Sequence, residues 1–75
     1  MLKEDLETKL SEKYRGYKFK VTINEDRIEI IHNYEDKIGD LDFIYEIFYL
    51  YEKLVGNNIT SYPIIYYDFL DEICL

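Results

Sequence analysis

The spacing of the apolar residues changes from four to two within the first third of the chain. Leu2, Leu6 and Leu10 lie four residues apart and Tyr14 continues the row, which predicts a helix with one apolar stripe. Between residues 17 and 23, apolar and polar side chains alternate, which is typical of a strand covered on one side. The chain therefore begins with a helix followed by a strand, and Gly16 suits the left-handed residue that ends such a helix.

A second strand is predicted directly after the first. Residues 24–27 are polar and turn-like, and Ile28 and Ile30 then resume the alternation, so the two strands form a hairpin. Ile31 breaks the pattern, which indicates either a strand covered on both sides or a bulge. Residues 33–39 form a polar connection, with Tyr34 and Ile38 as anchors or as part of a short third strand.

A helix is predicted over residues 41–55, capped by Asp40 and ended by Gly56. The expected buried row consists of Leu41, Ile44, Phe48, Tyr51 and Val55, widened by Tyr45, Ile47 and Leu54. The side chains expected on the opposite, solvent-facing side of the helix are Asp42, Glu46, Tyr49 and Lys53.

A last helix is predicted after Thr60 or Ser61, with Pro63 in its first turn. Its expected inward side chains are Tyr62, Ile65, Tyr66, Phe69, Leu70 and Ile73. The predicted fold is a single α+β domain over residues 1–75, in the order α-β-β-α-α, with the hairpin packed against the helices. Its free sheet edges could serve a third strand, a second copy or a partner.

Seventy-five residues are close to the lower limit for a chain that folds alone. Cys74 is the only cysteine, so stability must come from aromatic packing, from a second subunit or from a partner. Both a monomer and a homodimer are compatible with this size. Residues 1–5 lack the apolar run of a secretory signal, and no apolar stretch is long enough to span a bilayer, so we expect a cytoplasmic protein.

Charge is distributed unevenly along the chain. Residues 1–24 hold six bases and four acids, a net of +2, whereas residues 25–75 hold three bases and twelve acids, a net of −9. The acidic part also contains seven of the nine tyrosines. Such a surface repels nucleic acid and membranes and attracts basic grooves of proteins. The bases Lys9, Lys13, Lys18 and Lys20 form either a small basic face or ion pairs within the fold.

Neither catalysis nor a cofactor is indicated. His32 is the only histidine, and Cys74 lies beside Glu72, which disfavours its thiolate. Residues 35–42 hold four carboxylates and a glycine, but their spacing differs from that of a calcium loop, so no metal site is predicted. With one histidine and one cysteine, a zinc site is not supported either.

The acidic, tyrosine-rich surface is the best candidate for function. Rows of carboxylates resemble the phosphates of a nucleic acid, so a groove rich in Lys and Arg could accept them. The competing interpretation is that these acids only keep the surface soluble. The predicted partner-binding residues are Glu35, Asp36, Asp40, Asp42, Glu46, Tyr49, Tyr67, Asp68, Asp71 and Glu72.

In small size, acidity, tyrosine content and predicted element order, the chain resembles the phage-encoded anti-CRISPR proteins that mimic DNA. The resemblance carries no residue motif, and the basic residues of the first helix and strand depart from it. It implies a non-enzymatic inhibitor whose acidic face occupies the site where Cas9 reads the protospacer-adjacent motif with arginines. Two alternatives stay open: an immunity protein for a nuclease toxin, and a structural or regulatory module that dimerises through its hairpin edge or its tyrosine-rich helices.

Overall fold

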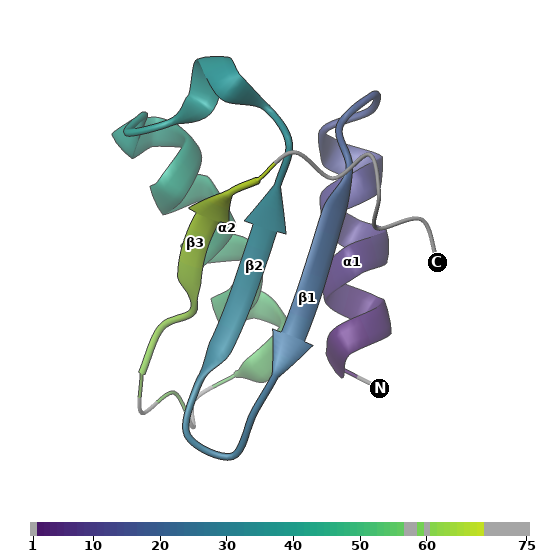
Figure 1. The fold of residues 1–75 in the computed structure, drawn as a ribbon. Coiled ribbons are helices and arrows are strands. Elements are labelled where there is room, and N and C mark those ends of the chain that lie inside the picture. Colours follow the sequence, from purple (N-terminus) through teal and green to yellow (C-terminus); the bar gives the residue numbers. More distant parts are fainter. Residues whose placement is uncertain (1, 57–58, 60, 69–75) are drawn as a thin grey trace.

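Within the part of the chain that the structure describes, three strands form one mixed sheet in the order β1-β2-β3, and two helices lie against one of its faces (Figure 1). This computed structural model describes residues 2–56, 59 and 61–68. The elements are α1 (Leu2–Lys13), β1 (Phe19–Ile23), β2 (Ile28–His32), the short 3-10 helix η1 (Glu35–Lys37), α2 (Leu41–Val55) and β3 (Ile64–Tyr67). The predicted α+β class is confirmed, with a strand in place of the last helix.

The apolar stripe of α1 faces the sheet as predicted. Leu6 and Leu10 are fully buried, and Leu2 and Tyr14 pack against the core from either end of the helix. Gly16 follows the helix with a φ of 93°, a left-handed value that favours glycine. The four-residue spacing therefore identified both the helix and the side that it buries.

The predicted hairpin is also present. β1 and β2 pair antiparallel, with Val21 opposite Ile30, and both of these side chains are buried. The N–H of Asn24 donates to the carbonyl of Arg27 (2.8 Å) and closes the turn. Ile31 pairs with Lys20 in an unbroken register, so Ile31 marks no bulge and lies half-buried on the face of the sheet away from the helices.

The prediction of a last helix is wrong for the described residues, since residues 64–67 form β3 and pair parallel to β2. Two neighbouring isoleucines and two tyrosines favour an extended strand, and the second edge of β2 offers backbone groups that need a partner. Of the two alternatives for residues 33–39, the short third strand is not formed, and residues 35–37 form η1 instead. Of the expected inward side chains, Ile65 packs against the core, Tyr62 and Tyr66 are exposed, and Phe69, Leu70 and Ile73 lie outside the described residues.

The bounds of α2 are as predicted, but the helix is rotated about its axis. Its buried residues are Phe43, Ile47 and Tyr51, at intervals of four, whereas the expected buried residues Leu41 and Tyr45 are exposed. Only four of the fifteen residues of α2 are charged, so several apolar rows were available. The row that starts at Phe43 faces the sheet, and the other expected members of the buried row are half-buried at its sides: Ile44, Phe48, Leu54 and Val55.

The core lies between the sheet and the two helices. Its fully or nearly buried apolar side chains are Leu6, Leu10, Val21, Ile30, Phe43, Ile47 and Tyr51. Among the described residues, no helix has both the length and the apolar character that crossing a bilayer requires. η1 and the start of α2 lie together at one end of the molecule (Figure 1).

Candidate protein-binding surface

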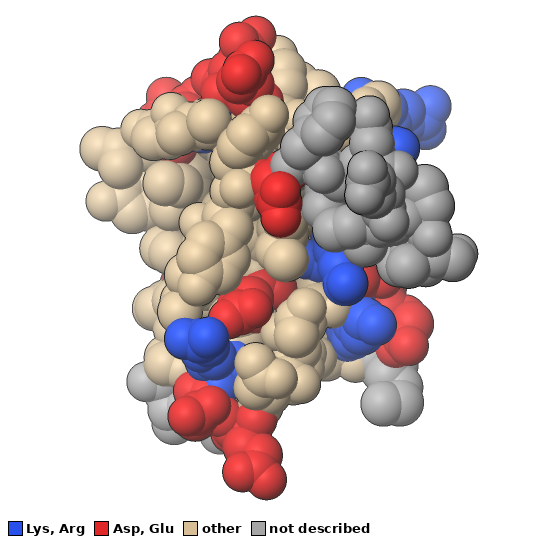
Figure 2. Space-filling model, in the orientation of Figure 1, with Lys and Arg blue, Asp and Glu red and all other residues tan. Residues whose placement is uncertain are grey.

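Four of the predicted contact residues lie at the end of the molecule formed by η1 and the first turn of α2. Glu35 and Asp36 belong to η1, Asp42 lies in the first turn of α2, and all three side chains are exposed. The acidic end, as we call Glu35, Asp36, Asp40 and Asp42, holds Lys37 as its one base, a net charge of −3. Acidic side chains gather where η1 lies in Figure 2.

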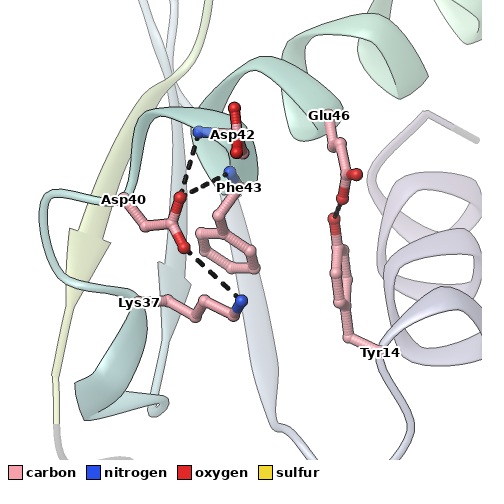
Figure 3. Close-up of polar contacts among 6 residues, drawn as sticks. All are labelled: Tyr14, Lys37, Asp40, Asp42, Phe43 and Glu46. Atoms are coloured by element: carbon pink, nitrogen blue, oxygen red, sulfur yellow. Dashed lines mark hydrogen bonds and ion pairs between the residues drawn. The ribbon is translucent and has the colours of Figure 1, made fainter.

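The carboxylate of Asp40 has bonding partners within its own segment of the chain (Figure 3). One carboxylate oxygen accepts the backbone N–H groups of Asp42 (3.0 Å) and Phe43 (3.3 Å), and the other lies 3.5 Å from Nζ of Lys37. The N–H of Phe43 and the Lys37 ammonium lower the pKa of Asp40 below its usual value. The predicted helix cap is confirmed, and this carboxylate has its bonding capacity largely used within the protein.

Glu46 lies apart from the acidic end, on the side of α2 that faces α1. Its carboxylate accepts a hydrogen bond from the hydroxyl of Tyr14 (Figure 3). Burial, followed by this hydrogen bond, raises the pKa of Tyr14 above its ordinary value. Glu46 also lines a groove of about 300 Å³ between the helices, whose other lining residues are Lys9, Lys13, Tyr49, Leu50, Lys53 and Leu54. Its surroundings are therefore basic.

Tyr49 is exposed, as expected, and it belongs to an exposed apolar row that is not among the predicted rows. Leu41, Tyr45 and Tyr49 follow each other at intervals of four, and their exposed fractions are 61%, 62% and 60%. We call these three residues the outer row of α2. Nζ of Lys53 lies 4.6 Å from the ring centre of Tyr49. Phe43, Ile47 and Tyr51 also follow each other at intervals of four in the sequence. If these three residues are buried, the outer row on the opposite side of the helix must be exposed, so this spacing was a signal for it.

The remaining predicted contacts belong neither to η1 nor to α2. Tyr67 lies on β3, is 37% exposed, and packs against His32 with 5.9 Å between the ring centres. The backbone N–H of Asp68 donates to the carbonyl of His32 (2.8 Å), and the side chain of Asp68 is exposed. Asp71 and Glu72 lie outside the described residues.

Charge is spread over several parts of the described surface. Figure 2 shows acidic side chains at the η1 end and again at the end where the hairpin turn lies, with uncharged surface and scattered acidic and basic side chains between them. The hairpin turn contains Glu25 and Asp26 beside Arg27, which pairs with Glu29 at 2.8 Å. The basic residues are divided too: Lys9 and Lys13 lie in the groove beside α2, whereas Lys20 is on the sheet.

His32, the only histidine, is buried against the face that the helices cover. It is 2% exposed, its Nδ1 accepts the backbone N–H of Tyr34 (3.1 Å), and its ring packs edge-on against Phe43. Burial lowers the pKa of His32, so the ring is neutral at pH 7 with its proton on Nε2. In this position the histidine packs the core. Within the described residues, no three His, Cys, Asp or Glu side chains are grouped as a metal site requires.

Comparisons with protein-family models, with curated proteins and with solved structures found no match to this chain.

Proposed function

We propose that this protein is a cytoplasmic, non-enzymatic inhibitor that binds a basic nucleic-acid-binding protein and blocks its DNA or RNA site by charge mimicry. The observation that supports the proposal most strongly is the acidic end. Glu35, Asp36 and Asp42 are exposed there, and none of the three forms an ion pair with another described residue.

Carboxylates of this kind offer a basic groove the same chemistry as phosphates. A guanidinium binds a carboxylate through two parallel N–H bonds, as it binds phosphate, and a site built for phosphates already holds such cations. The target is a nuclease or a CRISPR effector such as Cas9, whose arginines read a short DNA motif. Attraction between opposite charges would speed association at low salt, and the affinity would fall as salt rises.

The chain on either side of η1 is held in place, which limits the entropy lost when the acidic end binds. Before η1, the ring of Tyr34 stacks on that of Tyr17 with 3.8 Å between their centres. A hydrogen bond with Tyr34 is the main reason that the pKa of Tyr17 is raised to about 12. After η1, Asp40 bonds the first turn of α2 and Lys37. Glu35 and Asp36 are therefore presented from a segment that is fixed at both ends.

The other predicted contacts have a smaller part in this proposal. Glu46 accepts a hydrogen bond from Tyr14 and lies beside three lysines, and Asp68 directly follows β3. An immunity protein for a nuclease toxin would use the same acidic end, and only the identity of the partner separates it from an anti-CRISPR protein of a phage.

The test is inhibition of DNA cleavage by guide-loaded Cas9, measured with the wild-type protein and two charge-reversed variants. Glu35→Lys combined with Asp36→Lys should reduce inhibition by at least tenfold, because each reversal turns attraction into repulsion. The matched control reverses Glu25 and Asp26, an acidic pair in the hairpin turn at the other end. This control should inhibit like the wild type.

Full inhibition by the folded Glu35→Lys, Asp36→Lys variant would refute the acidic end as the contact surface. An absence of inhibition by the wild type would remove Cas9 as the target. The same variants would then be measured against a colicin-type nuclease, where a loss confined to the η1 variant favours an immunity protein.

A further inference from the structure

α2 has apolar side chains on two opposite sides, and the described residues bury only one of them. Phe43, Ile47 and Tyr51 pack into the core, whereas the outer row Leu41, Tyr45 and Tyr49 faces away from it. A helix that is apolar on both sides is normally covered on both sides. Contiguous exposed apolar side chains, tyrosine above all, are typical of protein interfaces. Among the described residues only Lys53 lies over this row, at Tyr49, and all three side chains stay more than half exposed.

Two charges on one flank of the outer row show which partner fits. Asp42 lies in the first turn of α2 and Lys53 in its last turn, eleven residues and thus about three helical turns further on. Both side chains are exposed, and neither pairs with an opposite charge among the described residues. If two copies of this helix packed antiparallel, the negative end of this flank on one copy would lie beside the positive end of the same flank on the other copy.

We propose that the protein forms a twofold homodimer in which α2 of one copy packs antiparallel against α2 of the other. Tyr45 and Tyr49 are equally far from position 47, so each Tyr45 would lie opposite Tyr49 of the other copy. In the same register, each Asp42 would pair with Lys53 of the other copy. A surface in which residue i meets residue j, and j meets i, is what a twofold interface requires.

The antiparallel direction suits the charges of the whole chain. Each copy carries a net charge of −7, and repulsion is smallest when the two acidic ends are far apart. Antiparallel helices place the acidic ends at opposite ends of the dimer, and the helix dipoles then oppose each other favourably. A parallel pair would instead bring both acidic ends together.

A basic partner protein is the other occupant to consider, and the surroundings of the outer row disfavour it. Lys53 lies on the flank of this row, and Lys9 and Lys13 line the adjoining groove. A uniformly basic surface would be repelled at this end of α2, whereas a second copy supplies Asp42 there. The dimer does not depend on the proposed inhibitor function. It uses Asp42 of the acidic end, whereas Glu35 and Asp36, the residues reversed in the inhibition test, stay outside the α2 contact.

Sedimentation equilibrium from about 1 to 500 µM measures the association. One helix face is at the small end of stable interfaces, which bury about 800 Å² on each partner, so we expect dissociation constants on the order of micromolar. Tyr45→Ser should weaken dimerisation at least tenfold, because it removes the central apolar side chain from both copies. The matched control is Tyr66→Ser, which alters an exposed tyrosine on the sheet and should leave dimerisation unchanged.

A monomeric mass across this range would overturn the proposal. A dimer that is equally strong in Tyr45→Ser, with circular dichroism confirming that the variant is folded, would overturn it as well.

A charge swap tests the antiparallel register. Asp42→Lys and Lys53→Asp should each weaken the dimer by roughly threefold to tenfold, because exposed pairs contribute modestly and the dimer contains two of them. The double variant exchanges the charges and should return the affinity to within about threefold of the wild type. If both single variants dimerise more weakly and the double variant does not regain the wild-type affinity, this pairing is contradicted.

Discussion

The carboxylate of Glu7 accepts a hydrogen bond from the backbone N–H of Val21, with 2.8 Å between Oε2 and N. Glu7 is on α1, and β1 is an outer strand of the sheet, so the bond joins helix and sheet. It satisfies a donor on the edge of β1 that β2 does not pair, and thereby protects that edge against another strand.

Removal of the Glu7 carboxylate should destabilise the protein. Glu7→Ala leaves the N–H of the buried Val21 without its acceptor, which we expect to lower the free energy of unfolding by about 1–3 kcal/mol. Chemical denaturation measures the change. Glu12→Ala, which alters an exposed acid of the same helix, is the control and should change the stability by less than about 0.5 kcal/mol. Equal changes in the free energy of unfolding of the two variants would show that the hydrogen bond of Glu7 does not contribute to stability.

Burial of His32 should make stability depend on pH just below neutrality. Burial lowers the pKa of His32 in the folded state, so the unfolded chain binds the proton more readily as the pH falls below about 6.5. With respect to His32, the free energy of unfolding is therefore constant above that pH. It decreases on acidification, by at most about 1.4 kcal/mol per pH unit for one proton. Denaturation with urea at pH 7.5, 6.5 and 5.5 measures this slope.

His32→Gln is the informative variant for this slope, since its side-chain oxygen can still accept the N–H of Tyr34 and does not titrate. Its stability should be lower than that of the wild type at pH 7.5 and nearly independent of pH down to 5.5. A wild-type protein that shows no slope over this range would contradict a buried neutral histidine.

Loss of the Asp40 cap should destabilise the start of α2. Asp40→Ala removes the acceptor of two backbone N–H groups and the partner of Lys37, so we expect Tm to fall on the order of 5 °C. Asp40→Asn keeps an acceptor oxygen and should lose less. The lowered pKa of Asp40 also means that its contribution is present above the ordinary aspartate pKa and is lost as the pH falls through the lowered value. Identical melting of all three proteins would contradict this role.

The hydroxyl of Tyr14 should contribute to stability at alkaline pH. Its pKa is raised in the folded state, so its stabilisation is complete below pH 10 and is lost as the pH rises further. Between pH 9 and 11 the wild type should therefore lose more free energy of unfolding than Tyr14→Phe does. Tyr17 and Tyr62 also have raised pKa values, so part of the decline should remain in the variant. An unchanged decline would show that the Tyr14 hydroxyl is not involved.

Local patterns in the sequence predicted most of the fold. The rows of α1, the alternation of the hairpin and the cap of α2 are each short-range features, and each is confirmed. The error at β3 has a tertiary cause. Residues 64–67 suit a helix or a strand by their apolar pattern, and the unpaired edge of β2 makes the strand favourable.

The candidate surface was harder to predict, because it depends on which side of α2 is buried. A helix with only four charged residues offers more than one apolar row, and the row that faces the sheet is selected by packing against Val21 and Ile30. The exposed positions of Leu41 and Tyr45 follow from that selection. The acids near η1 are evident in the sequence, but the sequence does not distinguish the carboxylate of Asp40, which caps α2, from the exposed carboxylates of Glu35, Asp36 and Asp42.

The parallel pairing of β2 with β3 has a consequence for how the protein is made. A parallel neighbour needs a long return connection, here α2, so the third strand cannot dock until the chain through Tyr67 has left the ribosome. A fragment that ends within α2 would hold its hairpin yet leave the backbone of β2 open to strands of other molecules, which is a route to aggregation. Premature termination or proteolysis after α2 should therefore yield insoluble material rather than a smaller working protein.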